Sequence, residues 1–296
     1  MTAAILPSSG ATATSSGRSR GRPARRGRPS PLPWIGATMM LVVIGYVIIV
    51  PLLPLYDPYG QDLTMILLRP GQHPEHLLGT DSLGRDTASR LALAGRVTLL
   101  IVLAIIVANA VIGLIIGTVA GYFGGRLDNL LMAVADIQLA LPVILVLIAL
   151  SATFGPGVML MVTVLSVTYW VGYARVARTA ARSLRERDFV LAPKLLGAGT
   201  PHILRVHVLP GVLSQILILA STDLGQVILL MSSFDYLGLG IQAPTPSWGS
   251  MISESQKYLR QNVWQAVVPG TMIFLVVAGM NLFSQRFTSE TAARHG

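Results

Sequence analysis

Six apolar stretches, each long enough to cross a lipid bilayer as a helix, constrain this sequence more than any other feature. About 20 apolar residues suffice for one crossing. The chain is 52% hydrophobic and 12% charged, whereas a soluble domain carries about 25% charged residues. Too little polar surface remains to cover a globule in water, so we expect an all-α polytopic membrane protein with six transmembrane helices. The stretches are 34–55, 97–120, 130–153, 158–176, 211–233 and 264–283.

The basic residues predict the orientation of these spans. Six arginines lie between positions 18 and 28, and seven Arg or Lys residues lie between 175 and 205. Because cytoplasmic segments carry an excess of positive charge, both termini are predicted to be cytoplasmic. An apolar stretch at 34–54 without an A-x-A site indicates an uncleaved first span rather than a signal peptide.

The same pattern divides the chain into segments. Residues 1–33 have almost no large apolar side chains and are expected to form a disordered, Arg-rich cytoplasmic tail. The first transmembrane helix, an outer loop, a five-helix core and a second cytoplasmic tail are expected to follow. Their ranges are 34–56, 57–95, 96–284 and 285–296, and the core includes a cytoplasmic loop at 177–209 and an outer loop at 234–263.

Several classes of site find no support in the sequence. The chain has no Cys, which excludes disulfides and thiolate metal sites. Its basic residues flank membrane spans, which argues against nucleic-acid binding. His73, Glu75 and His76 are a weak metal signal, and a solvated loop explains them better. We find no Walker-type phosphate loop and no catalytic constellation, and therefore predict no catalytic residue, metal or cofactor in this chain.

Polar and small residues inside the spans are candidates for packing or for a pathway. Gly113, Gly117 and Gly121 share one helix face, where absent side chains allow a second helix to approach closely. Asn109 and Asp223 lie within spans, where polar groups are costly and often functional. Two such residues are few for a proton relay, so lining a pathway or packing helices is the favoured interpretation.

The cytoplasmic loop carries signals for two short helices. Ser183 begins a capping-box pattern that predicts a helix start, and Gly197 is expected to end that helix. Thr200 and the proline after it predict a second helix, which Pro210 is expected to stop at the membrane. Such a pair can lie on the bilayer surface or in the groove of a partner protein.

Several motifs in and around this loop resemble the C-type inner-membrane permease subunit of ATP-binding-cassette importers for dipeptides, oligopeptides and nickel. The match runs from about residue 75 to 285. Its carrying motifs are LGTDSLGRD at 78–86, AGYFGG at 120–125, GYAR at 172–175, LRERDFV at 184–190, LGLG at 237–240 and PTPSWG at 244–249.

The resemblance also identifies an ATPase-docking motif, in which this chain departs from its relatives. The family pattern is Glu-Ala-Ala, three residues, Gly, nine residues, an aliphatic, any residue, then Leu-Pro. Leu-Ala-Pro replaces the first triplet and His207 takes the aliphatic position, while Gly197 and the final Leu-Pro match. Because proline removes a backbone donor, Pro193 is expected to kink or restart the helix. The implied coupling residues are Asp188, Phe189, Leu191, Ala192, Pro193, Leu196, Gly197, Ala198, His202, Leu209 and Pro210.

What the resemblance implies is a type I ABC importer permease fold in the bacterial cytoplasmic membrane. It implies four kinds of partner: a second homologous permease, two ATPase subunits that bind ATP and Mg, an extracytoplasmic substrate-binding protein, and the lipid bilayer. Dipeptides or short oligopeptides are the expected cargo, with nickel or another small cargo as the alternative. Outside the family, an ion-coupled secondary transporter is the competing hypothesis.

Overall fold

The computed structural model describes residues 32–294, with side chains described for 32–284. The predicted tails at 1–33 and 285–296 therefore lie largely outside the described residues and side chains. Within the described part, the chain is helical and forms no β-strand. Its helices are α1 (Leu32–Ile49), η1 (Val50–Leu52), α2 (Thr87–Phe123), α3 (Gly125–Leu139), α4 (Val143–Phe154), α5 (Val158–Leu184), α6 (Asp188–Leu195), α7 (Thr200–Ile203), η2 (Leu204–Val208), α8 (Leu209–Tyr236), α9 (Trp248–Ser255), η3 (Gln256–Tyr258) and α10 (Trp264–Arg294).

Among the described residues, five helical runs are long and apolar enough to cross a membrane, and a bent pair makes a sixth. The bent pair is α3 with α4, which meet at 74° where the sequence predicts one continuous span. Pro142 is the physical reason, because it has no amide hydrogen and its own backbone is extended, with ψ at 117°. Asp128 of α3 accepts two hydrogen bonds from Arg178 of α5, which fixes the first half of this span against α5.

The long helices α2 and α5 pack closely along one glycine face of α2. A Cβ atom at Gly113 would meet Tyr173, one at Gly117 would meet Ala174 and Ala177, and one at Gly121 would meet the backbone of Arg178, all closer than real Cβ atoms approach. The glycines therefore lie in a packing seam within the subunit.

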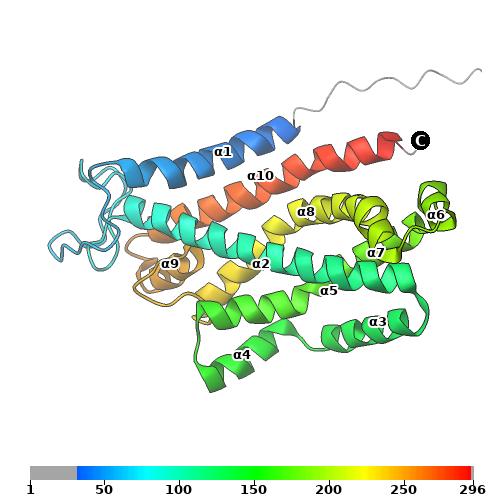
Figure 1. Cartoon of the computed structure of the whole chain (residues 1–296). Helices are drawn as coiled ribbons and strands as arrows, with labels where there is room; N and C mark the ends of the chain where they lie inside the picture. Colours follow the sequence, from blue (N-terminus) through cyan, green and yellow to red (C-terminus); the bar gives the residue numbers. More distant parts are fainter. Residues whose placement is uncertain (1–31, 295–296) are drawn as a thin grey trace, which may run out of the picture. The chain divides into compact units, whose positions relative to one another are not determined.

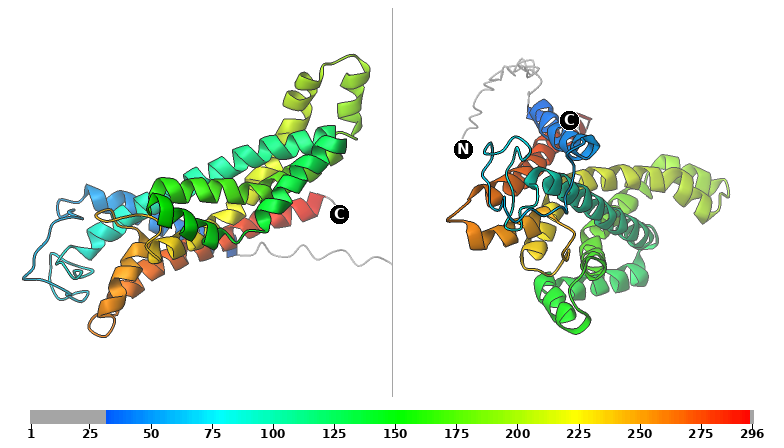
Figure 2. Two further views of the ribbon diagram at one scale, coloured as in Figure 1. Left: turned by 90° about the horizontal axis from the view of Figure 1, so that it is seen from below. Right: turned by 90° about the vertical axis from the view of Figure 1, so that its left-hand side faces the viewer.

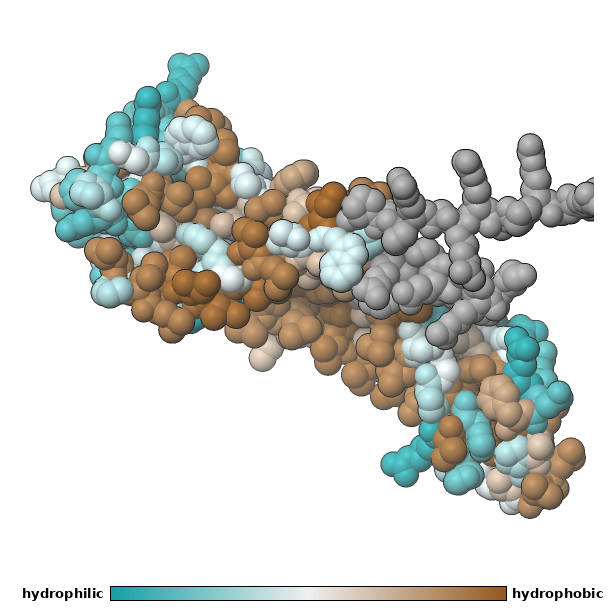
Figure 3. Space-filling view, turned by 90° about the horizontal axis from the view of Figure 1, so that it is seen from above, coloured by the Kyte–Doolittle hydropathy of each residue, from teal (hydrophilic) through white to brown (hydrophobic). Residues whose placement is uncertain are grey.

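The other long helices surround this pair. Figures 1 and 2 show α1 running beside α10, and α8 passing between α10 and the α2–α5 pair. In Figure 1, α1 begins and α10 ends toward the side where α6 and α7 lie, while α9 and the loop before α2 lie at the opposite ends of the helices. On the face drawn in Figure 3, apolar residues cover the surface between hydrophilic regions at the two ends. This pattern fits helices immersed in hydrocarbon with wet ends.

The seam generates a stability prediction. Replacing Gly117 by Ala places a methyl group on the Ala174 carbonyl, and overpacking of this kind costs roughly 1–3 kcal/mol. Gly270→Ala is the matched control, since Gly270 also lies within a helix and a Cβ there meets nothing within 4 Å. Thermal unfolding of the detergent-solubilised protein should show a lower midpoint for G117A alone. Equal midpoints for the two variants would contradict the packing assignment.

Candidate functional site

A groove runs between α5 and α8 along most of their length. Three cavities follow one another in it, of about 550, 680 and 350 Å³. The first two share Arg175 and Val176 as walls, and the last two share Tyr169, Asp223 and Gln226. These shared walls make the three cavities a continuous path.

Helical periodicity explains why the groove is partly polar. Residues three or four apart on a helix lie on one face, and each helix presents such a stripe to the groove. The stripe of α5 consists of Tyr169, Gly172, Arg175, Thr179 and Ser183, and the stripe of α8 consists of Gln215, Leu219, Asp223, Gln226 and Ser233. Of these residues, only Asp223 is predicted from the sequence to line a pathway, although the polar residues recur at helical spacing within the apolar spans.

The bend between α3 and α4 completes the middle cavity. Leu139, Leu141, Pro142 and Val143, which flank or form the bend, line this cavity opposite Asp223 and its neighbours. In a straight span, these residues would not come together at the wall of this cavity. The proline that interrupts the third span therefore also shapes the groove.

The structure places the two predicted polar residues in different environments. Asp223 lines both the middle cavity and the one that follows it. Asn109 is only 1% exposed, and neither polar atom of its amide has a hydrogen-bond partner within the described residues. Asn109 thus lies within the helix packing, whereas Asp223 lies on the wall of the groove.

Beyond one end of the groove, α6 and α7 form the helix pair that the sequence predicts. Gly197 ends the first helix in the left-handed conformation, with φ at +85°. Its amide donates to the Lys194 carbonyl at 3.2 Å, and the amide of Ala198 donates to the Pro193 carbonyl at 3.0 Å. These two bonds form a Schellman motif, which satisfies carbonyls at the helix end.

The helix pair is anchored at some of its residues and exposed at others. Val190 of α6 and Ile203 of α7 are buried in a cluster that includes Ala181 of α5 and Val212 of α8. In contrast, Leu195 at the end of α6 and Leu196, its C-cap, are 87% and 89% exposed. The helix pair is therefore packed against α5 and α8, the two helices that form the groove.

Three local predictions for this loop were wrong. The capping box at Ser183 does not start a helix, because α5 continues to Leu184 and α6 begins at Asp188. Pro193 does not break or restart α6, which runs two residues beyond it; only the bond to the Phe189 carbonyl is lost, near the start of the helix.

Pro210 does not stop the second helix either. A π-helical turn, η2, joins α7 directly to α8, and Pro210 lies in the first turn of α8. The wider turn avoids the hydrogen bond that proline cannot donate. The predicted coupling residues thus extend from α6 through η2 to the start of α8, in one connected segment.

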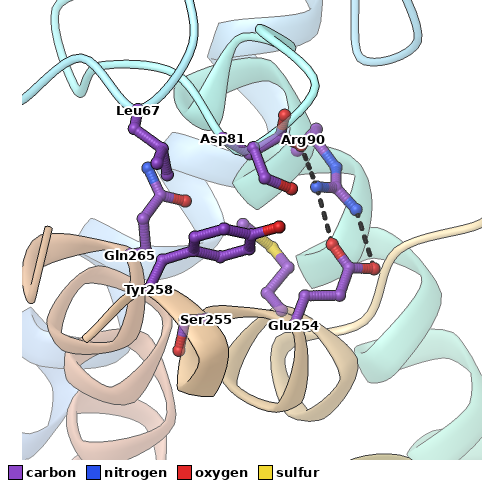
Figure 4. A pocket seen from close by; sticks show the side chains of 9 residues that line it. Leu67, Asp81, Arg90, Glu254, Ser255, Tyr258 and Gln265 are labelled. Atoms are coloured by element: carbon purple, nitrogen blue, oxygen red, sulfur yellow. Dashed lines mark hydrogen bonds and ion pairs between the residues drawn. The ribbon is translucent and has the colours of Figure 1, made fainter. Parts of the chain in front are cut away.

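A buried ionic network lies at the opposite end of the helices (Figure 4). Asp81 accepts hydrogen bonds from Arg85 Nε at 2.7 Å and from Arg90 Nη1. The exposed Glu254 of α9 accepts from Arg90 at 3.0 Å, as the dashed lines in the figure show. The network connects the loop before α2, the start of α2 and α9. The LGTDSLGRD motif contains Asp81 and Arg85, but not Arg90 or its partner Glu254 on α9.

Of the loop histidines, His76 contacts Asp86, and the rings of His73 and His76 lie against each other. His76 lies 3.0 Å from Asp86, whose carboxylate also caps α2 by accepting from the Ser89 amide at 2.7 Å. The rings of His73 and His76 lie 5.7 Å apart. The described residues contain no group of three or more His, Cys, Asp or Glu residues able to hold a metal ion.

Known proteins provide a comparison for this architecture. A family model described as "Binding-protein-dependent transport system inner membrane component" matches residues 113–289. The chain is 37% identical over 227 residues to the nickel transport system permease protein NikC of Escherichia coli (strain K12), covering 77% of this chain and 81% of that protein.

A second relative and a solved structure agree with this match. The chain is 36% identical over 251 residues to the di/tripeptide transport system permease protein DppC of Pseudomonas aeruginosa (strain UCBPP-PA14), covering 83% of each. A chain in a structure of the MetNI methionine ABC transporter in inward-facing conformations has a similar fold, with a TM-score of 0.55 and 19% identity. That similarity covers 68% of this chain and 95% of the other.

The ionic network gives a prediction for the stability of the end of the helices at which α9 lies. Asp81→Asn removes one of the two carboxylates that pair with Arg85 and Arg90 and leaves only the exposed Glu254 to compensate them. The side chain of Arg90 is only 3% exposed. Breaking a buried pair in this way costs about 3–5 kcal/mol. Glu186→Gln, which disrupts the exposed Arg185–Glu186 pair with atoms 3.8 Å apart, should cost less than about 1 kcal/mol. Thermal unfolding in detergent compares the two variants. A midpoint for D81N no lower than that for E186Q would refute a stabilising role for Asp81.

Proposed function

Because the chain belongs to the family of binding-protein-dependent transport system inner membrane components, we propose that it forms one half of the translocation pathway of an importer for dipeptides or short oligopeptides. The groove between α5 and α8 is the observation that carries this proposal, since it runs along two membrane helices and has polar walls. A second, homologous permease would close its open side.

The family resemblance found in the sequence motifs is confirmed. The chain is a multi-pass permease subunit of an ATP-binding-cassette importer of the inner membrane, and its type I importer fold is likewise confirmed. Such permeases are non-catalytic, and the ATPase is a separate subunit that acts with a substrate-binding protein.

In the proposed assembly, two ATPase subunits bind ATP and Mg, and each permease docks on one of them. The exposed Leu195 of α6 and its C-cap Leu196 support this role, because they offer an apolar surface to the groove of a partner. ATP-driven closure of the ATPases would then favour one permease conformation through differential contacts with α6. The anchoring of α6 and α7 on α5 and α8 provides the mechanical connection.

In this assembly, α6 and α7 face the cytoplasm, together with both chain termini. Two observations support the orientation. The segment at 175–205 is rich in Arg and Lys, as cytoplasmic segments are. In Figure 1, the start of α1 and the end of α10 lie toward the side of α6 and α7. The loop before α2 and α9 would then face the binding protein.

Nickel is the second candidate cargo, and the 37% identity to a nickel permease favours it. The di/tripeptide permease is similar at 36% identity, so identity does not separate the two. Uptake by the assembled complex in proteoliposomes, measured with radiolabelled dialanine and with ⁶³Ni²⁺, discriminates between them. ATP-dependent uptake of dialanine supports the peptide proposal, and uptake of nickel alone would overturn it.

Docking can be tested with the exposed leucines. The double variant Leu195→Ser, Leu196→Ser should lose co-purification of the ATPase subunits, because it removes apolar surface from the proposed contact. Leu77→Ser is the control, since Leu77 is also strongly exposed, at 71%, but lies in the loop before α2. Normal ATPase recovery with the double variant would contradict docking through α6.

A second variant tests coupling rather than docking. Gly197→Val forces a β-branched residue into the left-handed region at φ +85°, a strain of roughly 1–3 kcal/mol. We expect the Schellman turn to reshape, so that ATP hydrolysis continues while transport per ATP falls severalfold. Gly199→Ala is the matched control, because Gly199 has φ at −66° and an added Cβ meets only Pro201, at 3.8 Å.

The coupling experiment measures uptake and phosphate release in the same proteoliposomes. Membrane insertion of each variant is checked in parallel. Unchanged transport per ATP in G197V would count against a coupling role for this turn.

A further inference from the structure

We infer that the Asp223 carboxylate is the group in the groove that binds the cargo's ammonium, the free amino terminus of a short peptide. This inference rests on the proposed importer function and adds to it a chemical basis for cargo recognition inside the membrane.

The position of Asp223 singles it out. It is the only acidic residue among the described residues that line the three cavities of the groove. It lies near the middle of α8 (Leu209–Tyr236), where a charge is costly unless it finds a partner. The carboxylate is thus placed where a passing cation would meet it in low dielectric.

The described structure leaves this carboxylate without a cationic partner. Arg175, which lines the same cavity, is held 2.6 Å from Asp136. The hydroxyl of Tyr173 lies near Asp223, but it is a neutral group and does not compensate the carboxylate charge. An unpaired charge at this depth is strongly destabilising, and a cargo cation would compensate it during passage.

The neighbouring groups fit an ammonium better than a metal ion. An ammonium group has three hydrogen-bond donors. Asp223, the amide oxygen of Gln226 and the hydroxyl of Tyr169 are three oxygen acceptors on the same two cavities. No His, Cys or second carboxylate is among the described lining residues, whereas nickel is well served by imidazole ligands. The aromatic ring of Tyr169 can add a cation–π contact.

The test uses the complete complex of permeases, ATPases and binding protein in proteoliposomes. Binding protein loaded with dialanine is kept saturating, so that capture outside the membrane stays constant. We expect Asp223→Asn to lower ATP-dependent dialanine uptake about tenfold or more, as for the loss of a charged hydrogen bond. D223E, which keeps the charge, should retain most of the uptake.

A charge-rescue experiment separates binding from packing, because this chain contains no Cys. D223C is modified after assembly with a sulfonate-bearing, a neutral or an ammonium-bearing methanethiosulfonate reagent of similar size. We expect the sulfonate alone to restore uptake. S233C, at another wall of the groove, should show no preference for the sulfonate. The wild-type complex is treated with the same reagents in parallel. Any change in its uptake reports a reaction at cysteines of the partner subunits.

The outcomes distinguish this inference from the proposed function. If the wild type and D223N take up dialanine at equal rates, the inference is overturned and the proposed peptide importer stands. Equal rescue by the neutral reagent would assign Asp223 to packing, and loss of the second permease from the D223N complex would assign it to assembly. Either result would also overturn the inference. Uptake of ⁶³Ni²⁺ without dialanine by the wild type would overturn both.

Discussion

The close packing of α2 on α5 is the contact on which the rest of the structure depends. Three glycines of α2 allow α5 to approach until its backbone fills the space of absent side chains. One face of α5 is thereby committed to α2, and the polar stripe on another face remains available to the groove. Because lipid offers no hydrophobic driving force between helices, this kind of close approach is what holds such a pair together.

At both ends of the long helices, side-chain contacts tie short elements to the rest of the chain. At one end, α6 and α7 share a buried cluster with α5 and α8, while two leucines stay exposed. At the other end, Asp81 and Arg90 tie the loop before α2 to α9. In the proposed importer, such connections would be the physical route by which contacts at the two ends influence the membrane helices, as coupling between distant sites requires.

The spans and the family were predictable from the sequence, and the local details of the loop were not. Span composition reflects the energetic cost of polar groups in hydrocarbon, which acts on every residue and leaves a strong pattern. Capping signals are local preferences of about 1 kcal/mol, a proline in a helix interior costs about 3 kcal/mol, and packing overrides both. Thus α5 continues past Ser183 to Leu184, and a π-helical turn carries the chain into α8 at Pro210.

The sequence by itself determined that this chain is an all-α membrane protein of the importer permease family, with a glycine face on its second span and a carboxylate within its fifth. Only the tertiary structure decided that the third span bends by 74°, that Asn109 is buried, and that Asp223 lines a groove with Tyr169 and Gln226. The reason is physical. Hydropathy is a property of each residue and sums along the chain, whereas a cavity depends on which faces of distant helices meet.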